Sequence, residues 1–205
     1  MSYLCSLFLG LVSGARCATL SSIGINKHLH KSIATALLVG VWISSPLQAE
    51  EDRLDLLFER LQQAEPQEVE RIEGQIITEF GKSGSPAMDL LRRRGEEALE
   101  AGEFGIAAEH FTALVDHAPT FSEGYHGRAT AYYNLGLYGP AIDDLRETLV
   151  LEPRHFGAMI GVAVILEELE RPDDALEVWM QVEALMPNDP EVAEVIARLQ
   201  TQMTG

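Results

Sequence analysis

The sequence contains little cysteine and few aromatic residues. Of its 205 residues, two are cysteines, Cys5 and Cys17, and 7% are aromatic. Because both cysteines lie near the N-terminus, the chain beyond residue 49 can form no disulfide and offers no thiol nucleophile or thiolate metal ligand. That part must be stabilised by packing, and a hydrophobic content of 46% is enough for a packed core.

Basic residues are also scarce. The chain carries 15 lysines and arginines against 32 acidic residues, a formal net charge of −17. Nucleic-acid-binding proteins usually carry a basic patch, so this balance argues against a nucleic-acid partner. Residues 1–49 hold three of the basic residues and no acidic one, which leaves 12 basic and 32 acidic groups, a net charge of −20, in residues 50–205. The uneven distribution indicates two segments of different kinds.

Sequence motifs for catalysis and for metal binding are absent as well. The chain has no phosphate-binding glycine loop, nucleophile elbow, His-Glu-x-x-His zinc motif or calcium loop. His110 and His117 are seven residues apart, whereas paired metal ligands on a helix usually lie three or four apart. We therefore expect no cofactor, no metal and no enzymatic activity. The least favoured alternative is a metal site built from His126, His155 and nearby acids.

Residues 1–49 are predicted to be an export signal. Lys27 and Lys31 supply a positive region, residues 33–43 form an apolar run, and Ala49 precedes a plausible cleavage site. The run is shorter than the roughly 20 apolar residues of a membrane-spanning helix. We expect cleavage after Ala49 and export, to the periplasm if the source is a bacterium, with no stable membrane insertion afterwards; an uncleaved anchor is the alternative.

Residues 1–26 fit this signal less well, because residues 3–12 form a second apolar stretch before the positive region. Two explanations remain open. Either the leader is long and composite, or translation starts within residues 1–30 at a later codon, for which Leu29 is a candidate.

A 34-residue repeat organises the rest of the chain. Three prolines, Pro119, Pro153 and Pro187, recur at this interval. Five further columns at fixed distances before each proline agree in character across the three windows. Two hold small residues (Gly95, Ala129, Ala163; Ala107, Ala141, Ala175) and three hold mostly larger apolar ones (Phe111, Leu145, Trp179; Leu91, Tyr125, Met159; Ala98, Tyr132, Leu166).

Each window is predicted to form two antiparallel helices, because small residues let helices approach closely and the proline ends the second helix. In the second window, Tyr125, Ala129 and Tyr132 recur at helical spacing. Thr120 and Glu123 have the spacing of a capping box, which predicts the start of that helix. The pair Asp143-Asp144 is interpreted as part of a solvated helix face.

These columns resemble the tetratricopeptide repeat (TPR) family. The resemblance implies an all-α fold, an α-α superhelix or solenoid of about three regular repeats, residues 88–121, 122–155 and 156–189. The family usually has leucine where this chain has Arg94, Arg128 and Val162, so the arginines are expected to extend outward along their aliphatic stems. The chain also resembles small exported bacterial repeat proteins over residues 80–86, 115–119 and 152–158.

Helical segments are predicted on both sides of the repeats. Residues 50–87 show two apolar stripes, one before and one after Pro66, and are interpreted as a degenerate helical pair that caps the N-terminal side. Residues 190–205 carry an apolar stripe that includes Val192, Ile196 and Leu199, and are predicted to form a C-terminal capping helix.

The resemblance implies a concave face lined by the first helix of each repeat, where family members bind peptides or partner helices. The candidate partner-binding residues are Arg92, Glu96, His126, Thr130, Tyr133, Ile160 and Val164, with Asp89, Leu99, Glu123 and Glu167 beside them. A partner with an apolar segment and a nearby acidic group would suit this set. The alternative is that a neighbouring helix buries Ile160 and Val164. A clamp built from paired lysines and asparagines is not expected, since Lys82 is the one lysine beyond residue 49.

The function that we expect is that of a non-enzymatic protein-interaction adaptor of the cell envelope, with a partner peptide or helix in the concave groove. The alternative is a structural protein that associates with itself, because the ends of repeat solenoids can stack. The partner and the oligomeric state do not follow from the sequence.

Overall fold

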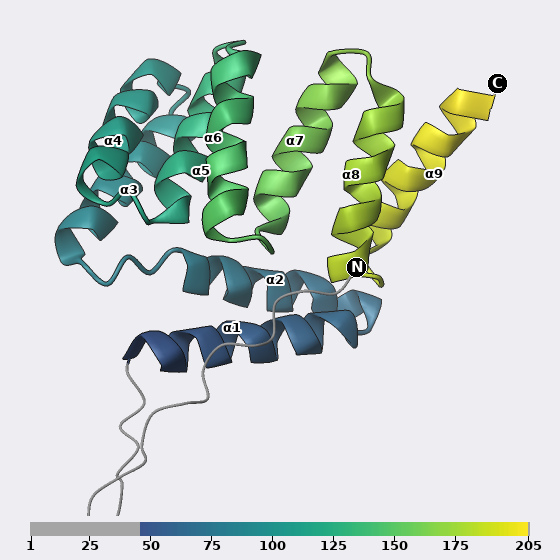
Figure 1. Cartoon of the computed structure of the whole chain (residues 1–205), viewed down its shortest axis with the longest axis horizontal. Helices are drawn as coiled ribbons and strands as arrows, with labels where there is room; N and C mark the ends of the chain where they lie inside the picture. Colours follow the sequence, from purple (N-terminus) through teal and green to yellow (C-terminus); the bar gives the residue numbers. More distant parts are fainter. Residues whose placement is uncertain (1–45, 205) are drawn as a thin grey trace, which may run out of the picture. The chain divides into compact units, whose positions relative to one another are not determined.

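The structure, a computed structural model, describes residues 46–204, and the described secondary structure is entirely α-helical (Figure 1). The helices are α1 (Pro46–Gln62), α2 (Pro66–Phe80), α3 (Pro86–Glu100), α4 (Phe104–His117), α5 (Ser122–Asn134), α6 (Tyr138–Leu151), α7 (Phe156–Glu168), α8 (Pro172–Leu185) and α9 (Pro190–Thr204). None of them is long and apolar enough to cross a membrane. The predicted leader lies outside the described residues, except for its last four, which begin α1.

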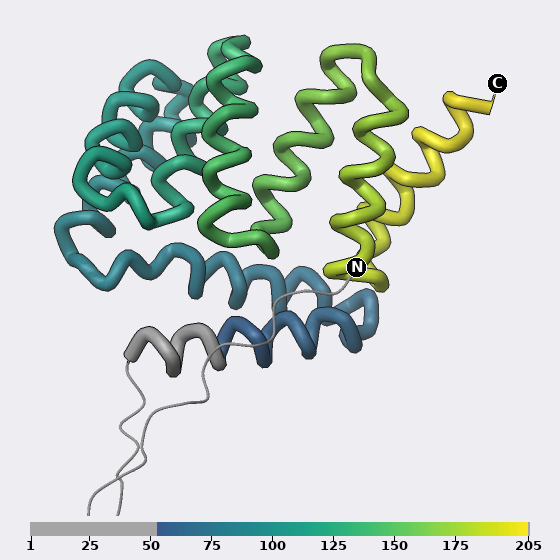
Figure 2. Tube along the Cα trace, viewed as in Figure 1, coloured from purple at the N-terminus to yellow at the C-terminus, as the bar shows by residue number. Residues whose placement is uncertain are grey.

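Helices α3/α4, α5/α6 and α7/α8 form three successive antiparallel pairs, and α9 packs on α8 (Figure 2). The small-residue columns explain this packing. Ala107, Ala141 and Ala175 are completely buried, and a Cβ added at Gly95 would lie 2.6 Å from Cζ of Phe111. The predicted all-α superhelix of three repeats, with an N-terminal helical pair and a C-terminal helix, is confirmed.

The turn inside each repeat has the same geometry but not the same residue. Gly102 and Gly136 take positive φ angles of 74° and 73° after the first helices of repeats one and two. Glu170 takes φ 57° at the equivalent place in the third repeat, where glycine would be free of the steric cost of a side chain.

Arg128 does not extend into solvent as expected. Its Nε and Nη2 donate to the two carboxylate oxygens of Asp144, both at 2.7 Å, and its guanidinium lies 5.6 and 5.9 Å from the ring centroids of Tyr125 and Tyr132. Asp144 is only 7% exposed, so the interpretation of both Asp143 and Asp144 as solvated is wrong for the second. Arg128 instead joins α5 to α6 by a bidentate ion pair, whereas Arg94 is exposed as expected.

Helices α1 and α2 form a hairpin that does not cap the first repeat as expected. Its buried apolar side chains belong to one core with α7, α8 and α9, and the hairpin runs across one edge of the stack of helices (Figure 1). Arg154 bonds Asp55 at 2.7 Å and lies 4.5 Å from the ring centroid of Phe58. Asn188 donates to the carbonyl of Ala64 at 2.9 Å. The hairpin thus binds the third repeat and α9.

Candidate partner-binding groove

The candidate residues lie on the first helices of the three repeats, as the spacing requires. Arg92 and Glu96 are on α3, the next three are on α5, and the last two are on α7; all are half-buried. The structure brings Glu96, His126 and Thr130 to the wall of one cavity of about 220 Å³. The members that do not line this cavity are Arg92, Tyr133, Ile160 and Val164.

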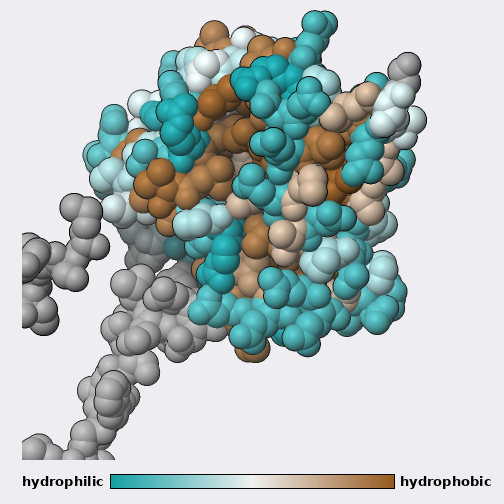
Figure 3. All heavy atoms as spheres, turned by 45° about the vertical axis from the view of Figure 1, so that its right-hand side comes forward, coloured by the Kyte–Doolittle hydropathy of each residue, from teal (hydrophilic) through white to brown (hydrophobic). Residues whose placement is uncertain are grey.

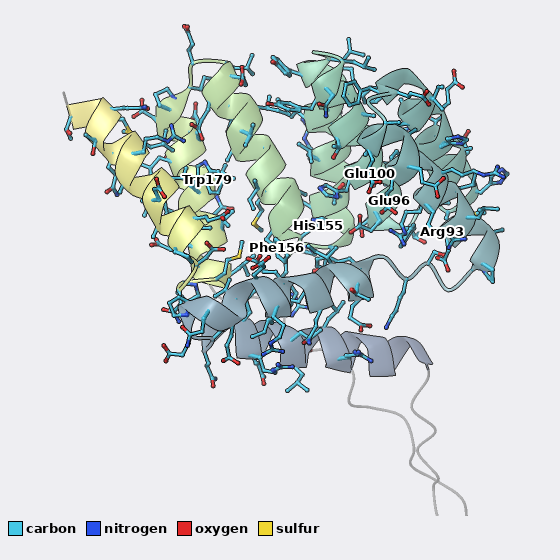
Figure 4. The ribbon with its side chains drawn as sticks, turned by 180° about the vertical axis from the view of Figure 1, so that it is seen from behind. Arg93, Glu96, Glu100, His155, Phe156 and Trp179 are labelled. Atoms are coloured by element: carbon cyan, nitrogen blue, oxygen red, sulfur yellow. The ribbon has the colours of Figure 1, made fainter. Side chains whose placement is uncertain are left out.

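The cavity is lined by residues of five helices and has a mostly apolar wall. Its apolar residues are Ile77, Phe80, Leu99, Phe111 and Phe156, its polar ones are Glu96, Glu123, His126, Thr130 and His155, and Gly127 and Gly157 complete it. Ile77, on α2, is 55% exposed, whereas Phe111 is 1% exposed, so the cavity opens beside Ile77 and ends at Phe111. In Figure 4, His155 and Phe156 lie directly above α2, and Glu96 lies on α3.

At this cavity, Glu123 joins two histidines, one within α5 and one at the N-cap of α7. Its Oε1 is 3.1 Å from Nε2 of His155, and its Oε2 is 3.4 Å from Nδ1 of His126. Nδ1 of His155 accepts the N–H of Ala158 at 3.0 Å and caps α7. This bond fixes the tautomer, because the proton of neutral His155 must then sit on Nε2 and be donated to Glu123.

The contacts of Glu123 keep it ionised although its side chain is only 14% exposed. Burial alone would raise the pKa of Glu123, but the hydrogen bonds that it accepts from His126 and His155 hold that pKa well below its usual range. The predicted capping box does not form: Phe121 stands at the N-cap of α5 with no side-chain cap bond. The Glu123 carboxylate bonds the two histidines instead of the backbone N–H of Thr120.

Glu123, His126 and His155 are also the described residues that could hold a metal ion, since one ligand atom of each lies within 4.8 Å of the others. The N-cap bond opposes this use. A metal on Nε2 of His155 displaces its proton, and a metal-bound imidazole normally donates from the other nitrogen. Here Nδ1 faces an N–H donor, Ala158, so the geometry favours a hydrogen-bonded cluster over a metal centre.

The ring of His155 is also packed against the hairpin. Phe80 stacks on it with ring centroids 4.7 Å apart and ring planes at 9°. The ring centroids of Phe80 and Phe156 are 6.3 Å apart. Phe80, Phe111 and Phe156 were not among the candidate site residues predicted from the sequence. A signal for His155 existed, because it precedes α7 as Asp189 precedes α9 at the 34-residue interval, and Asp189 also accepts helix N–H bonds.

Arg92, the cation expected to meet an acidic partner group, already has an acidic neighbour. It pairs with Glu96 one turn further along α3, and its Nε is buried without a hydrogen-bond partner. Its guanidinium carbon lies 3.4 Å from the position of a Cβ at Gly81, so the residue after α2 covers it. On the other side of the groove, Arg198 pairs with Glu167 at 2.8 Å.

Tyr133, Ile160 and Val164 line a more open and apolar part of the molecule. The ring of Tyr133 lies 5.8 Å from that of Tyr138, and partial burial, followed by the charge of Glu168, raises the pKa of Tyr133. Ile160 and Val164 pack partly against the core shared with the hairpin, and remain half-exposed. Figure 3 shows apolar residues gathered across the middle of one face of the molecule.

The fold and the groove together define a helical-repeat scaffold of the kind that recognises other proteins. No known protein-family profile matches the chain. A TPR repeat-containing protein of Rhizobium etli is 30% identical over 163 residues, which are 79% of this chain and 78% of that protein. The chain therefore belongs to the tetratricopeptide repeat proteins, which generally carry no catalytic activity.

More distant relatives and solved structures share the repeat region. Hsp70-Hsp90 organizing protein 1 of Glycine max is 24% identical over 56% of this chain, but over only 20% of its own length. The first TPR domain of Spaghetti (RPAP3), bound to the HSP90 peptide SRMEEVD, matches 58% of this chain and 94% of its own with a TM-score of 0.54 and 19% identity. The Yersinia enterocolitica type III secretion chaperone SycD, in complex with a peptide of the translocator YopD, is also similar. The match covers 58% of this chain and 96% of SycD, with a TM-score of 0.54 and 17% identity. At these identities the structures show the fold alone.

Proposed function

We propose that this protein is a non-enzymatic adaptor that binds a segment of a partner protein along the groove formed by α3, α5 and α7. The observation that carries the proposal is the cavity, because the first helices of all three repeats contribute residues to its lining, of which Glu96, His126 and Thr130 are half-exposed. Solved structures of the same fold contain bound peptides, such as that of HSP90. Glu123, His126 and His155 are bonded to one another, which supports recognition over catalysis.

Binding in this groove would rest on shape and apolar contact. Tyr133, Ile160 and Val164 offer the half-exposed apolar surface beside the cavity, and an apolar face of a partner helix or peptide gains about 25 cal/mol for each Å² of apolar surface that it removes from water. Arg92 is already paired with Glu96, and Arg198 with Glu167. Polar contacts with a partner would therefore come mainly from the residues that line the cavity.

Capture from an extract of the producing cell tests this proposal with the full chain as bait. Tyr133→Ala and Ile160→Asp should lose the partner, because they remove apolar contact or place a charge in the groove. Val150→Asp is the matched control, since Val150 is 67% exposed on α6 and lines no described cavity. Each variant is first checked by thermal unfolding. Unchanged capture by folded Tyr133→Ala and Ile160→Asp would remove the groove as the binding site.

We also propose that the adaptor works in the cell envelope, after export and cleavage of its leader. The charge pattern and apolar run of residues 27–49 support this. Cleavage after Ala49 would remove the first turn of α1 and leave Leu54, Leu57 and Phe58, which pack in the core of the hairpin. N-terminal sequencing of the protein from the cell should begin at Glu50; a chain that retains residues 33–43 would favour the anchored alternative.

A further inference from the structure

The cavity between α2 and the repeats has an acidic and aromatic wall. Glu96 and Glu123 supply two carboxylates, and Phe80, Phe111 and Phe156 supply three phenyl rings. Among the described residues, no lysine or arginine lines it. Carboxylates attract cations, and phenyl rings carry no charge that would oppose one, so this wall favours a positively charged group over a negatively charged one.

Among the residues of this wall, Glu123 should attract a cation most strongly. It is ionised, and its hydrogen-bond donor His155 is held in the neutral tautomer by Ala158. A carboxylate offers about four acceptor positions, of which His126 and His155 use two. The negative charge therefore lies in mostly apolar surroundings with acceptor capacity left over, and a cation placed beside it would interact more strongly than in water.

The shape of the cavity suits a cation on an apolar stem. Its opening lies beside Ile77, and its inner end is formed by Phe111, with Leu99 along the side. Lysine and arginine side chains carry a charged head on three or four methylene groups, which pack on apolar surface while the head meets a polar partner.

The surrounding charges point the same way. The nearest basic candidate, Arg92, is paired with Glu96, and Arg198 is paired with Glu167. Residues 50–205 carry a net charge of −20. By contrast, the peptide SRMEEVD seen with the Spaghetti domain carries three acidic residues. Charge complementarity thus argues against an acidic segment at this place and for a basic one.

We propose that this cavity is a subsite for a lysine or arginine side chain of the partner, whose apolar neighbours lie on Tyr133, Ile160 and Val164. The proposal rests on the proposed function, since it assigns the chemistry of the segment that enters the groove. It reverses the expectation of an acidic partner group, because Arg92 is engaged with Glu96 and the described lining of the cavity contains two carboxylates but no lysine or arginine.

Small lysine analogues test the subsite without the partner. The full chain is titrated with the Nα-acetyl methylamides of lysine, norleucine and glutamate, of which the lysine compound keeps its charged ε-ammonium group. The δ1-methyl NMR signal of Ile77 is followed. The lysine compound should shift this signal and bind about tenfold more tightly than norleucine, the factor expected for one charge-assisted hydrogen bond. Glu123→Gln should abolish most of that preference.

Matched variants keep this test decisive. Glu109→Gln removes the same charge from an exposed position on α4 and should leave the preference unchanged. If Glu123→Gln does not fold, the comparison of the three compounds on the unchanged protein still decides. Glu96→Gln should then reduce the preference only in part, because the Glu96 carboxylate is already paired with Arg92. Equal binding of lysine and norleucine, tighter binding of glutamate, or no shift of Ile77 by any compound would each overturn the subsite.

The two proposals fail in different ways. If Ile160→Asp abolishes partner capture while the lysine compound shows no preference, the groove binds a partner but the cavity is not a cation subsite. If the lysine preference depends on Glu123 while Ile160→Asp leaves capture intact, the cavity binds cations but the groove is not where the partner binds.

Discussion

Arg128 and Asp144 join the two helices of the second repeat at a position where most family members have leucine. The pair is bidentate at 2.7 Å and largely buried, whereas the adjacent Asp143 forms an exposed pair with Arg146. Asp144→Ala should lower the free energy of unfolding by about 3 kcal/mol, because it leaves a half-buried guanidinium unpaired. Urea unfolding measures this.

The neighbouring residue provides the control for that measurement. Asp143→Ala removes the same side chain and should cost at most about 0.5 kcal/mol, since exposed ion pairs contribute little. Equal losses for Asp143→Ala and Asp144→Ala would show that the bidentate pair does not stabilise the second repeat.

The cluster of Glu123, His126 and His155 gives a second prediction at the scale of residues. Because Nδ1 of His155 caps α7, Zn²⁺ should leave the melting temperature unchanged at neutral pH. His155→Asn keeps a capping side chain and should cost less stability than His155→Ala, which should lose about 1 kcal/mol. A rise in melting temperature with Zn²⁺ that His126→Ala abolishes would show instead that the cluster is a metal site.

The turns within the repeats show how one element tolerates different residues. Glu170 adopts φ 57° in the third repeat, where the other repeats have Gly102 and Gly136. Glu170→Gly should raise the free energy of unfolding by up to about 1 kcal/mol, because glycine adopts this conformation without a Cβ clash. Thermal and urea unfolding measure the gain.

The reverse substitution in the second repeat is the matched control. Gly136 adopts φ 73°, and nothing crowds the position of its Cβ, so Gly136→Ala should destabilise by about 1 kcal/mol through the backbone alone. A loss of stability in Glu170→Gly would mean that the Glu170 side chain makes a contact that outweighs the strain.

At the scale of the whole molecule, the hairpin and α9 meet at an acidic contact. Burial, then a hydrogen bond with Asp189 and the charges of Asp189, Glu191 and Glu70, raise the pKa of Glu73 on α2 to about 7 from an ordinary value of 4.5. The folded chain therefore binds this proton more tightly than the unfolded chain. Stability should fall as the pH rises from about 4.5 to about 7, where the carboxylate forms.

Glu73→Gln tests this dependence, because it removes the charge and keeps the shape. At pH 8 it should stabilise the protein by on the order of 1 kcal/mol, since the half-exposed carboxyl is partly screened by water. At pH 4 it should have no effect. Glu68→Gln, exposed on the same helix, is the control. A gain for Glu73→Gln that is equal at both pH values would exclude titration of Glu73 as its cause.

The repeats and part of the groove could be predicted because they depend on local spacing. Gly95 and Ala107 pack within one repeat. Small residues recur at both positions every 34 residues, so the sequence alone predicts this packing in each repeat. The prediction of a capping box at Thr120 was wrong because the Glu123 carboxylate instead bonds His155, which is 32 residues away in the sequence. Arg128 was misjudged for the same reason, since Asp144 lies in the next helix.

The 34-residue period decides the helical pairs and their order, because each repeat needs only its neighbours to bury its apolar columns. The position of the α1–α2 hairpin follows no such period. It depends on contacts such as Arg154 with Asp55 and Asn188 with Ala64, between residues about 100 apart or more. The cavity arises where this hairpin brings Phe80 against His155, so its charge and its walls exist only in the folded chain.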